Sequence, residues 1–315
     1  MLWSQRKAIA SPPSGPPEKL SMSISSENLP DHCLVEAGPK KILITGGKGN
    51  FAAPICRELA GCGEVILTDV SPTGENETFS YHQADLTDFP RVIELMKGID
   101  TVVHLAVVSG KNFPVGSSLG PSELDPYHEK LLQVNPRIAY HVFEAARRAE
   151  VRRIVYASSL AIYYGDKTRP SYHESDLPDP QNLYACTKLF GENLARIYHR
   201  DFGLETLSLR IGQPFPSHSS HDLVWRGHRR VRSSSVTVED IGRAVAAAVK
   251  STETSGIFNV VSDSDNPRYD LENSRRMGYV PSGRFTEEGL FRRSSEKAPW
   301  VMESPTAGEP IFENQ

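Results

Sequence analysis

Ser159, Tyr184 and Lys188 have the types and the spacing needed to remove a proton from an alcohol. Tyr184 and Lys188 are four residues apart in a stretch with helical character, so their polar ends share one helical face. A phenol with the usual pKa of ~10 is a poor base at neutral pH. An ammonium group about 4 Å away, at an effective dielectric constant of ~20, contributes roughly 4 kcal/mol and lowers that pKa by up to about three units. We therefore predict Tyr184 as the general base, Lys188 as its electrostatic partner and Ser159 as the group that orients the substrate oxygen.

The elements that must position these residues are a strand and a helix. Residues 153–159 form an apolar run that ends in paired serines, which predicts a strand. A helix is expected from Tyr184 to about Arg200, after a connection punctuated by prolines. The position of the tyrosine and lysine after such a strand is more informative than their spacing alone.

A glycine-rich stretch near the start of the ordered chain, residues 40–57, predicts a strand, a tight turn and a helix. Gly46, Gly49 and Ala52 are three residues apart, which suits close approach of the backbone to a pyrophosphate. Backbone N–H groups at the start of the helix would face the diphosphate. A plain strand-to-helix turn also favours glycine, so the next strand must decide between the two readings.

That next strand, residues 65–69, ends in Asp69, 23 residues after Gly46. An acid about 20 residues beyond the first glycine is the expected partner of a ribose 2′-hydroxyl. Asp69 therefore favours NAD over NADP, whose 2′-phosphate it would repel. Asp85, after a further strand, is a candidate partner for the adenine amino group or a helix cap, and the two roles are compatible.

From residue 40 onward, predicted strands and helices alternate, which indicates an α/β fold with a doubly wound parallel sheet of the Rossmann type. The remaining expected elements are strands at 79–84 and 101–106, helices at 89–97 and 127–150, and a strand followed by a helix at 236–250. His104, in the fourth strand, is expected to be a core or backbone-bonded histidine. The loop at 109–125 is a candidate substrate lid.

Composition narrows the class of protein. The chain has 315 residues, 38% hydrophobic content and a net charge of −4, which favours neither a nucleic-acid nor a membrane-surface binder. No apolar run approaches the ~20 residues that span a bilayer. The cysteines lack paired spacing, which indicates free thiols and a cytoplasmic protein; they are Cys33, Cys56, Cys62 and Cys186. Residues 1–39 are expected to be a disordered leader and 303–315 a loose tail.

Two polar clusters carry weaker signals. Arg226, Arg229, Arg230 and Arg232 offer a guanidinium for a carboxylate or phosphate, or form a solvated basic stretch. A second cluster, in a predicted loop, lacks a fourth ligand, so no metal site is predicted; its members are His218, His221 and Asp222.

The combined motifs resemble the extended short-chain dehydrogenase/reductase family, in the group of NAD-dependent epimerases and dehydratases. The motifs cover about residues 40–265 and comprise Thr45–Ala52, Asp69, Asp85-Leu86, His104–Ala106, Ser158-Ser159, Tyr184–Lys188, Leu209–Gly212 and Val236–Ile241. The resemblance implies an NAD-binding Rossmann domain at 40–210 and a small substrate-binding region at 211–302, with Rossmann elements interleaved at 236–262. It also implies homodimers that pair through the two long helices.

The resemblance assigns roles to individual residues. It implies cofactor binding by Gly46, Gly47, Gly49, Asn50, Phe51, Asp69, Asp85, Leu86, Leu105, Ala106, Asn135, Tyr184 and Lys188, the last as a ribose anchor. It implies substrate binding by Ser109, Ser159, Leu160, Tyr184, Gln213 and Arg229. The 25-residue separation from Tyr184 places the catalytic serine at Ser159 and not at Ser158.

Within this family, the carboxyl-terminal pattern at 259–281 and the overall length resemble uronate dehydrogenases. Two departures stand at the substrate site. The subgroup usually follows its serine with Asn-His, where this chain has Leu160-Ala161, and its Arg-Ile-Gly-Ser becomes Arg210–Gln213. The Leu160–Tyr163 run instead resembles the epimerases, with Tyr164 as an extra residue.

Three functions follow. The first is an NAD-dependent oxidoreductase that transfers a hydride from a sugar or sugar-acid carbinol to NAD. The second is a nucleotide-sugar epimerase or dehydratase that retains its NAD; the short region after Arg210 argues against it. The third is a non-catalytic NAD-binding protein.

Overall fold

The computed structural model describes residues 40–72, 79–109, 126–165, 169–215, 233–285 and 291–293. The predicted leader (1–39), the predicted tail (303–315) and all but the first residue of the predicted lid loop lie outside these ranges. The same holds for Arg229 and its neighbouring arginines, and for His218, His221 and Asp222.

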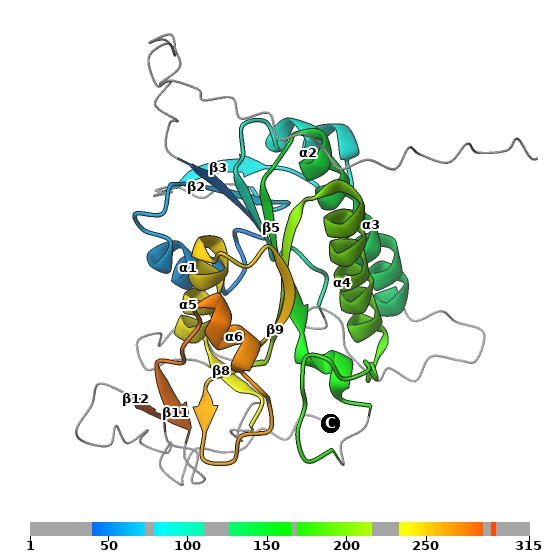
Figure 1. Cartoon of the computed structure of the whole chain (residues 1–315). Coiled ribbons are helices and arrows are strands. Elements are labelled where there is room, and N and C mark those ends of the chain that lie inside the picture. The colour runs from blue at the N-terminus through cyan, green and yellow to red at the C-terminus, as the bar shows by residue number, and fades with distance from the viewer. Residues whose placement is uncertain are drawn as a thin grey trace, which may run out of the picture. The chain divides into compact units, whose positions relative to one another are not determined.

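A parallel sheet of seven strands forms the centre of the fold (Figure 1), in the order β3-β2-β1-β4-β5-β6-β9. Its strands are β1 (Lys41–Thr45), β2 (Glu64–Asp69), β3 (Ser80–Gln83), β4 (Thr101–His104), β5 (Arg153–Ser159), β6 (Glu205–Ile211) and β9 (Ser255–Val260). The chain winds outward from β1 through β2 and β3, then returns to place β4 on the other side of β1. This reversal opens a crevice at the carboxyl ends of β1 and β4. The predicted doubly wound parallel sheet is confirmed.

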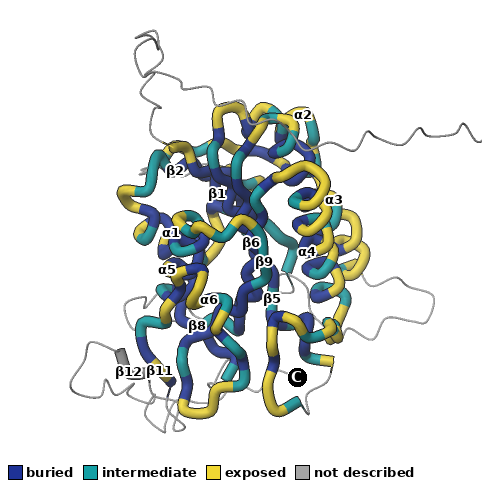
Figure 2. The backbone as a smooth tube through the Cα atoms, viewed as in Figure 1, coloured by how far each residue is buried: buried dark blue, intermediate teal, exposed yellow. Residues whose placement is uncertain are grey.

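Helices cover both faces of the sheet, as Figure 1 shows. The first face carries α1 (Ala52–Glu58), α5 (Val238–Lys250) and α6 (Glu272–Met277); the second carries α2 (Phe89–Leu95), α3 (Pro126–Arg148) and α4 (Leu183–Phe202). Each face has its own apolar core, because the buried strands alternate their side chains between the two sides. Figure 2 shows the central strands as mostly buried and the helices as exposed on their outer sides, whereas the edge strand β3 is largely exposed.

The helix that carries the predicted base has strong signals at both ends. The side chain of Asn182 caps α4, with Oδ1 accepting the Ala185 N–H at 3.0 Å. Gly203, at φ +71°, ends the helix in the left-handed conformation that glycine favours. The start of α4 and therefore the position of Tyr184 are fixed locally by sequence.

Short elements lie beyond the carboxyl edge. They are η2 (Leu160–Tyr163), the parallel pair β7 (Gln213–Phe215) and β8 (Ser235–Thr237), and the small sheet of β10 (Asp263–Ser264), β11 (Gly283–Phe285) and β12 (Phe291–Arg293). A third apolar cluster, which includes Tyr163, Tyr172 and Tyr269, packs beneath η2. The domain boundary near residue 211 stays a prediction.

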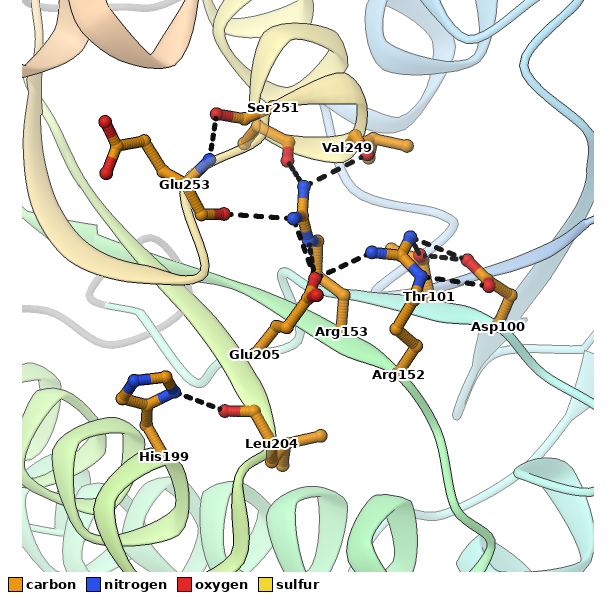
Figure 3. A network of polar contacts seen from close by, with 11 residues as sticks. Asp100, Thr101, Arg152, Arg153, His199, Leu204, Glu205, Val249, Ser251 and Glu253 are labelled. Carbon is orange, nitrogen blue, oxygen red and sulfur yellow. Dashed lines mark hydrogen bonds and ion pairs between the residues drawn. The ribbon is translucent and has the colours of Figure 1, made fainter. Parts of the chain in front are cut away.

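At the opposite, amino-terminal edge of the sheet, a buried arginine joins β5 to β6 and to the end of α5 (Figure 3). Arg153 is 2% exposed, and its Nε donates to Glu205 at 2.7 Å. Its remaining N–H groups donate to main-chain carbonyls at and beyond the end of α5, namely those of Ala248, Val249 and Glu253. One guanidinium therefore satisfies the last carbonyls of a helix and joins β5 to β6.

Arg152 extends this network across the sheet. It pairs with both oxygens of Asp100 before β4 and also reaches Glu205 at 2.7 Å. Arg152 is one-third exposed, so its pairs contribute less to stability than those of buried Arg153.

Replacing Arg153 by methionine tests this difference. We expect Arg153→Met to lower the free energy of unfolding by about 3 kcal/mol, because Glu205 and three carbonyls lose a buried donor. Arg152→Met, the matched control, is expected to cost about 1 kcal/mol or less. Urea denaturation measures both, and equal losses for the two variants would contradict the assignment.

Candidate active site

A cavity of about 1130 Å³ lies along the carboxyl edge of the sheet, where the strand order reverses. It extends from the ends of β1 and β2, past the segment after β4 and the end of β5, to the segment after β6. This is where ligands bind in open α/β sheets. The cavity joins the glycine-rich turn to the predicted catalytic residues.

The glycine-rich turn forms one wall of the cavity. Gly46 has φ +76°, and a Cβ there would lie 2.9 Å from the backbone N of Ala106. The N–H of Gly49 donates to the Gly46 carbonyl at 2.8 Å and closes the turn. A Cβ at Gly47 would meet the Leu67 side chain at 2.9 Å. Gly46 and Gly47 are therefore required for close packing of the turn against β4 and β2.

Two carboxylates stand at the same end of the cavity in fixed orientations. Asp69 accepts the Lys48 N–H at 3.0 Å on Oδ2 and the Ser71 N–H at 3.1 Å on Oδ1. Asp85 accepts the Thr87 N–H at 2.8 Å, and this bond lowers the pKa of its carboxyl group. The end of β2 thus presents an oriented acid beside the turn, as the sequence predicts for a ribose partner.

His104 holds β1 and β4 together and faces no substrate space. Its Nδ1 lies 2.7 Å from Thr45 Oγ1, which also accepts the Ala106 N–H at 3.2 Å. Burial lowers the pKa of His104 to about 3, so the ring is neutral at physiological pH. The predicted core histidine is confirmed, with a side-chain hydroxyl as its partner.

The two serines that end β5 have different surroundings. Ser158 is buried, and its hydroxyl donates to Glu192 at 2.5 Å. Ser159 lines the cavity and accepts the Ala161 N–H at 3.2 Å, which caps η2. Its hydroxyl hydrogen remains available to a ligand oxygen. Both serines line the cavity, so the choice of Ser159 over Ser158 stays a prediction, which is favoured by the bond of Ser158 to Glu192.

Tyr184 and Lys188 both line the cavity, on the same face of α4. Lys188 Nζ lies 5.8 Å from the centre of the Tyr184 ring and donates to the Ala157 carbonyl at 2.7 Å. Burial lowers the pKa of Lys188 to about 7. Burial also raises the pKa of Tyr184, with Tyr127 acting in the same direction. The expected lowering of the phenol pKa is therefore not found, because desolvation outweighs the attraction of the ammonium group.

Asn135 links the two halves of the site without lining the cavity. Its Oδ1 accepts the Val108 N–H at 2.8 Å, and its Nδ2 donates to the Val108 carbonyl at 3.1 Å and to Thr187 Oγ1 at 3.2 Å. The proline that follows, Pro136, lies inside α3. Asn135 thus fixes the segment after β4 against α4.

Most of the residues predicted to bind ligands meet in this cavity. Those that line it are Gly46, Gly49, Asn50, Phe51, Asp69, Asp85, Leu86, Leu105, Ala106, Ser109, Ser159, Tyr184, Lys188 and Gln213. Gly47, Asn135 and Leu160 do not line it. Leu160 is fully buried in the apolar cluster beneath η2, which places its side chain away from the cavity.

Several residues that line the cavity were not predicted from the sequence to bind a ligand. Lys48 and Lys130 line the end that holds the two carboxylates, whereas Tyr164 and Pro214 line the substrate end. Lys48 lies within the glycine motif and Tyr164 was noted as an extra residue, so both had a signal. Lys130 had none, because its place depends on how α3 packs.

These residues fit a dinucleotide. Gly46 leaves room where a side chain would fill the wall, Asp69 is oriented beside the turn, and the cavity continues to Ser159, Tyr184 and Lys188. A nicotinamide at that far end would lie beside an alcohol, an acid–base group and a cation. The arrangement can therefore support proton transfer from a carbinol bound next to the cofactor.

Comparison with known proteins identifies similar chains. The sequence model of the NAD dependent epimerase/dehydratase family matches residues 42–238. Uronate dehydrogenase from Pseudomonas putida is 27% identical over 281 residues, 86% of this chain and 91% of that protein. Uronate dehydrogenase from Agrobacterium fabrum is 33% identical over 196 residues, 60% of this chain and 68% of that protein. A solved mutant of uronate dehydrogenase from Agrobacterium tumefaciens, complexed with NAD, gives a TM-score of 0.64 at 26% identity and covers 78% of this chain and 85% of its own.

Within the described ranges, no three or more His, Cys, Asp or Glu side chains gather to hold a metal ion. Across the same ranges, every helix is too short or too polar to cross a membrane.

The glycine-rich turn gives a matched test of cofactor binding. Gly46 and Gly61 have similar positive φ values, +76° and +81°, but a Cβ at Gly61 would meet nothing within 4 Å. We expect Gly46→Ala to weaken NADH binding by at least about tenfold, or about 1.4 kcal/mol. The reason is that the new Cβ would push the turn away from the backbone of Ala106. Gly61→Ala should lose a comparable backbone stability of ~1 kcal/mol and keep its affinity for NADH. Fluorescence titration with NADH checks both, and equal affinities would contradict the role of the turn.

Proposed function

Because the chain belongs to the NAD dependent epimerase/dehydratase family, we propose that it is an NAD-dependent oxidoreductase acting on a sugar or sugar acid. The predicted family and the NAD cofactor are confirmed by the comparisons, whereas the substrate and the base are our proposal. The observation that carries it is the meeting of Ser159, Tyr184 and Lys188 with the glycine-rich turn in one cavity. Relatives named uronate dehydrogenase support a dehydrogenase.

In the proposed mechanism, Tyr184 is the general base. Ser159 donates its free hydroxyl hydrogen to the carbinol oxygen and holds it in line with the phenol. Tyr184, in its phenolate form, accepts the proton of the carbinol hydroxyl and becomes a neutral phenol. NAD⁺, when bound, supplies the acceptor for the hydride that leaves the carbinol carbon. Lys188 would hold the nicotinamide ribose through N–H groups not bonded to Ala157, and its charge would offset that of the phenolate.

In the protein without ligand, the pKa of Tyr184 is raised, so the proposed base needs a neighbouring positive charge to lose its proton. In the cavity without ligand charges, burial favours the neutral phenol. Oxidised cofactor would bring a positive charge to this cavity, and such a charge would favour the phenolate of Tyr184. We therefore propose that Tyr184 becomes a usable base only in the complex with NAD⁺, which couples proton removal to cofactor binding.

The substrate end differs from that of uronate dehydrogenases as the sequence indicated. Leu160 is buried in the apolar cluster, whereas Tyr164, Gln213 and Pro214 line the same cavity as Ser159. The second candidate function, a nucleotide-sugar epimerase or dehydratase with retained NAD, is favoured by this Leu160–Tyr163 run. Free release of NADH separates the two, because an epimerase returns its reducing equivalents to the same substrate.

The experiment is NADH absorbance after mixing the protein and NAD⁺ with free aldoses, uronic acids, and UDP- or dTDP-sugars. We expect sustained NADH formation with a free sugar or uronate, and a fall in kcat/KM of about 10²–10⁴-fold in Tyr184→Phe. Tyr198→Phe is the matched control, because it removes a hydroxyl from the same helix where Tyr198 bonds Glu144 at 3.1 Å, outside the cavity.

Conversion of a nucleotide sugar with the cofactor retained and no NADH would replace the dehydrogenase with the epimerase or dehydratase. Equal activity of Tyr184→Phe and the parent protein would refute Tyr184 as base. Binding of NADH without turnover of any substrate would favour the third reading, a non-catalytic NAD-binding protein.

We also propose a homodimer that pairs through α3 and α4. These helices pack together and expose large apolar side chains. The exposed side chains are Leu132 and Tyr140 on α3, and Phe190, Ile197 and Phe202 on α4. Phe190 and Ile197 are seven residues apart, two turns along one face. Free Cys56, Cys62 and Cys186 support the predicted cytoplasmic location.

Light scattering after gel filtration tests this pairing. We expect the parent protein to have the mass of a dimer, and Phe190→Glu/Ile197→Glu that of a monomer, because two charges would be buried against the partner. Val280→Glu, at an exposed valine outside both helices, should stay dimeric. A monomeric parent protein, or a dimeric double variant, would count against this interface.

A further inference from the structure

Beneath the catalytic pair lies a buried aromatic ring that the proposed mechanism does not use. Tyr156, on β5, is 3% exposed, and the centre of its ring lies 5.3 Å from Lys188 Nζ. This is within the ~6 Å range over which an aromatic face attracts a cation. The same ammonium group donates to the carbonyl of the next residue, Ala157. Two adjacent residues of β5, Tyr156 and Ala157, therefore contact the Lys188 ammonium group.

The helix is built to admit this ring. Gly191 is one turn beyond Lys188 on α4, and a Cβ there would lie 2.1 Å from Tyr156 Cζ and 2.2 Å from its hydroxyl oxygen. Gly191 has helical φ, so the glycine is not required by backbone conformation. A glycine in a helix interior costs about 1 kcal/mol relative to alanine. Space for Tyr156 explains why the sequence has glycine here.

Neighbouring rings fix the orientation of Tyr156. His104 on β4 lies 5.8 Å from it and Phe143 on α3 lies 6.1 Å away, centre to centre. Because both neighbours are buried, the ring has little freedom to turn. Its face is thus presented to Lys188 by three elements of the fold.

We propose that Tyr156, in the space left by Gly191, is a positioning residue that holds the Lys188 ammonium group in its charged form at the cofactor end of the cavity. The proposal rests on the proposed function for the role of Lys188, but its geometry does not depend on which substrate is used. It assigns the aromatic ring, and not its hydroxyl, as the active part.

Lys188 needs a neighbour that stabilises its positive charge, because the side chain is buried. Lys188 is 4% exposed, and burial lowers its pKa to about 7, so a neutral amine competes with the ammonium group near physiological pH. The attraction of the ring face opposes this loss of charge. The described titratable groups that face Lys188 are His104, Tyr156 and Tyr184, and none is an anion at neutral pH.

The nearest carboxylate on the same helix does not substitute for the ring. Glu192 receives the Ser158 hydroxyl and two N–H groups of Arg210. Its charge is therefore already paired with a buried guanidinium. Among the described residues, two aromatic rings face the ammonium group, those of Tyr156 at 5.3 Å and Tyr184 at 5.8 Å. Tyr156 is the nearer of the two and is not the proposed base.

A lysine is charged below its pKa, so the ribose anchor is present at acid and neutral pH and lost as pH rises through the folded pKa. Removing the ring lowers that pKa further. The binding of NADH should then fail at a lower pH in a variant without the ring.

The test is NADH affinity, by fluorescence titration between pH 5.5 and 9, for the parent protein, Tyr156→Phe and Tyr156→Leu. We expect Tyr156→Leu to move the alkaline midpoint of binding down by about 0.4–1.5 pH units, the range that a ring–cation attraction supplies. Tyr156→Phe, which keeps the ring, should keep the parent midpoint. Far-ultraviolet circular dichroism confirms that each variant is folded.

A second measurement covers the case in which Tyr156→Leu does not fold. Gly191→Ala pushes against the ring directly, and we expect it to weaken NADH binding at neutral pH by about tenfold. Gly191→Ala keeps Tyr156 but displaces its ring, so it should also move the alkaline midpoint of NADH binding to lower pH. A folded Gly191→Ala variant with the parent midpoint and the parent affinity would overturn the proposal.

These measurements distinguish a failure of the role proposed for Tyr156 from a failure of the proposed oxidoreductase activity. Identical midpoints for the parent protein, Tyr156→Phe and Tyr156→Leu would overturn the role of Tyr156, whatever substrate is turned over. A shifted midpoint in a protein that oxidises no sugar would support Tyr156 while rejecting the oxidoreductase. A shift of equal size in Tyr156→Phe would assign the effect to the hydroxyl and also overturn the proposal.

Discussion

The buried pair of Arg210 and Glu192 is the interaction on which the geometry of the site depends. Their side chains are 2% and 4% exposed, and two N–H···O bonds of 2.9 and 2.8 Å join them. Arg210 belongs to β6 and Glu192 to α4, and Glu192 also accepts the hydroxyl of Ser158 on β5. Removing one member of such a pair typically costs about 3–5 kcal/mol, because the other charge is left buried. One carboxylate thus fixes α4 against two strands.

The same pair sets the distances between catalytic groups. Glu192 lies one turn beyond Lys188 and two turns beyond Tyr184 on α4, so anchoring it anchors both. Its bond to Ser158 also fixes the residue before Ser159. Arg210 continues the network to the Tyr163 hydroxyl and to the Glu174 carbonyl at 3.2 Å, which reaches the segment that surrounds η2. The serine and the tyrosine–lysine pair come from distant parts of the sequence, and this network holds them together.

How much of this was predictable depends on whether a signal is local. The strands at 42–44, 65–69 and 153–159 and the helix from Tyr184 were predicted because their turns, caps and apolar runs lie within a few residues. Asp69, Ser159 and Lys188 were singled out by equally local patterns, and the fold brings them to one cavity; their roles stay predictions. Leu160 was assigned to substrate by its position after Ser159, yet its side chain turns into an apolar cluster that distant tyrosines complete. Lys130, the pairing of Arg210 with Glu192, and the raised pKa of Tyr184 all depend on tertiary packing, for which the sequence holds no short-range signal.

The two edges of the sheet divide stability and function between them. At the amino edge, Arg153 satisfies the Glu205 carboxylate and several carbonyls that would otherwise be buried without a donor. At the carboxyl edge, the described residues around Lys188 offer one carbonyl and two tyrosine rings and no carboxylate hydrogen bond, an arrangement that destabilises the folded state at neutral pH. A counter-anion there would restore stability, but it would also cancel the charge that the proposed chemistry needs. Because the strands run parallel, the network of Arg153 and Glu205 lies at the edge opposite the cavity. Its contribution to the free energy of unfolding can therefore offset the cost of burying the Lys188 ammonium group without placing any group in the cavity.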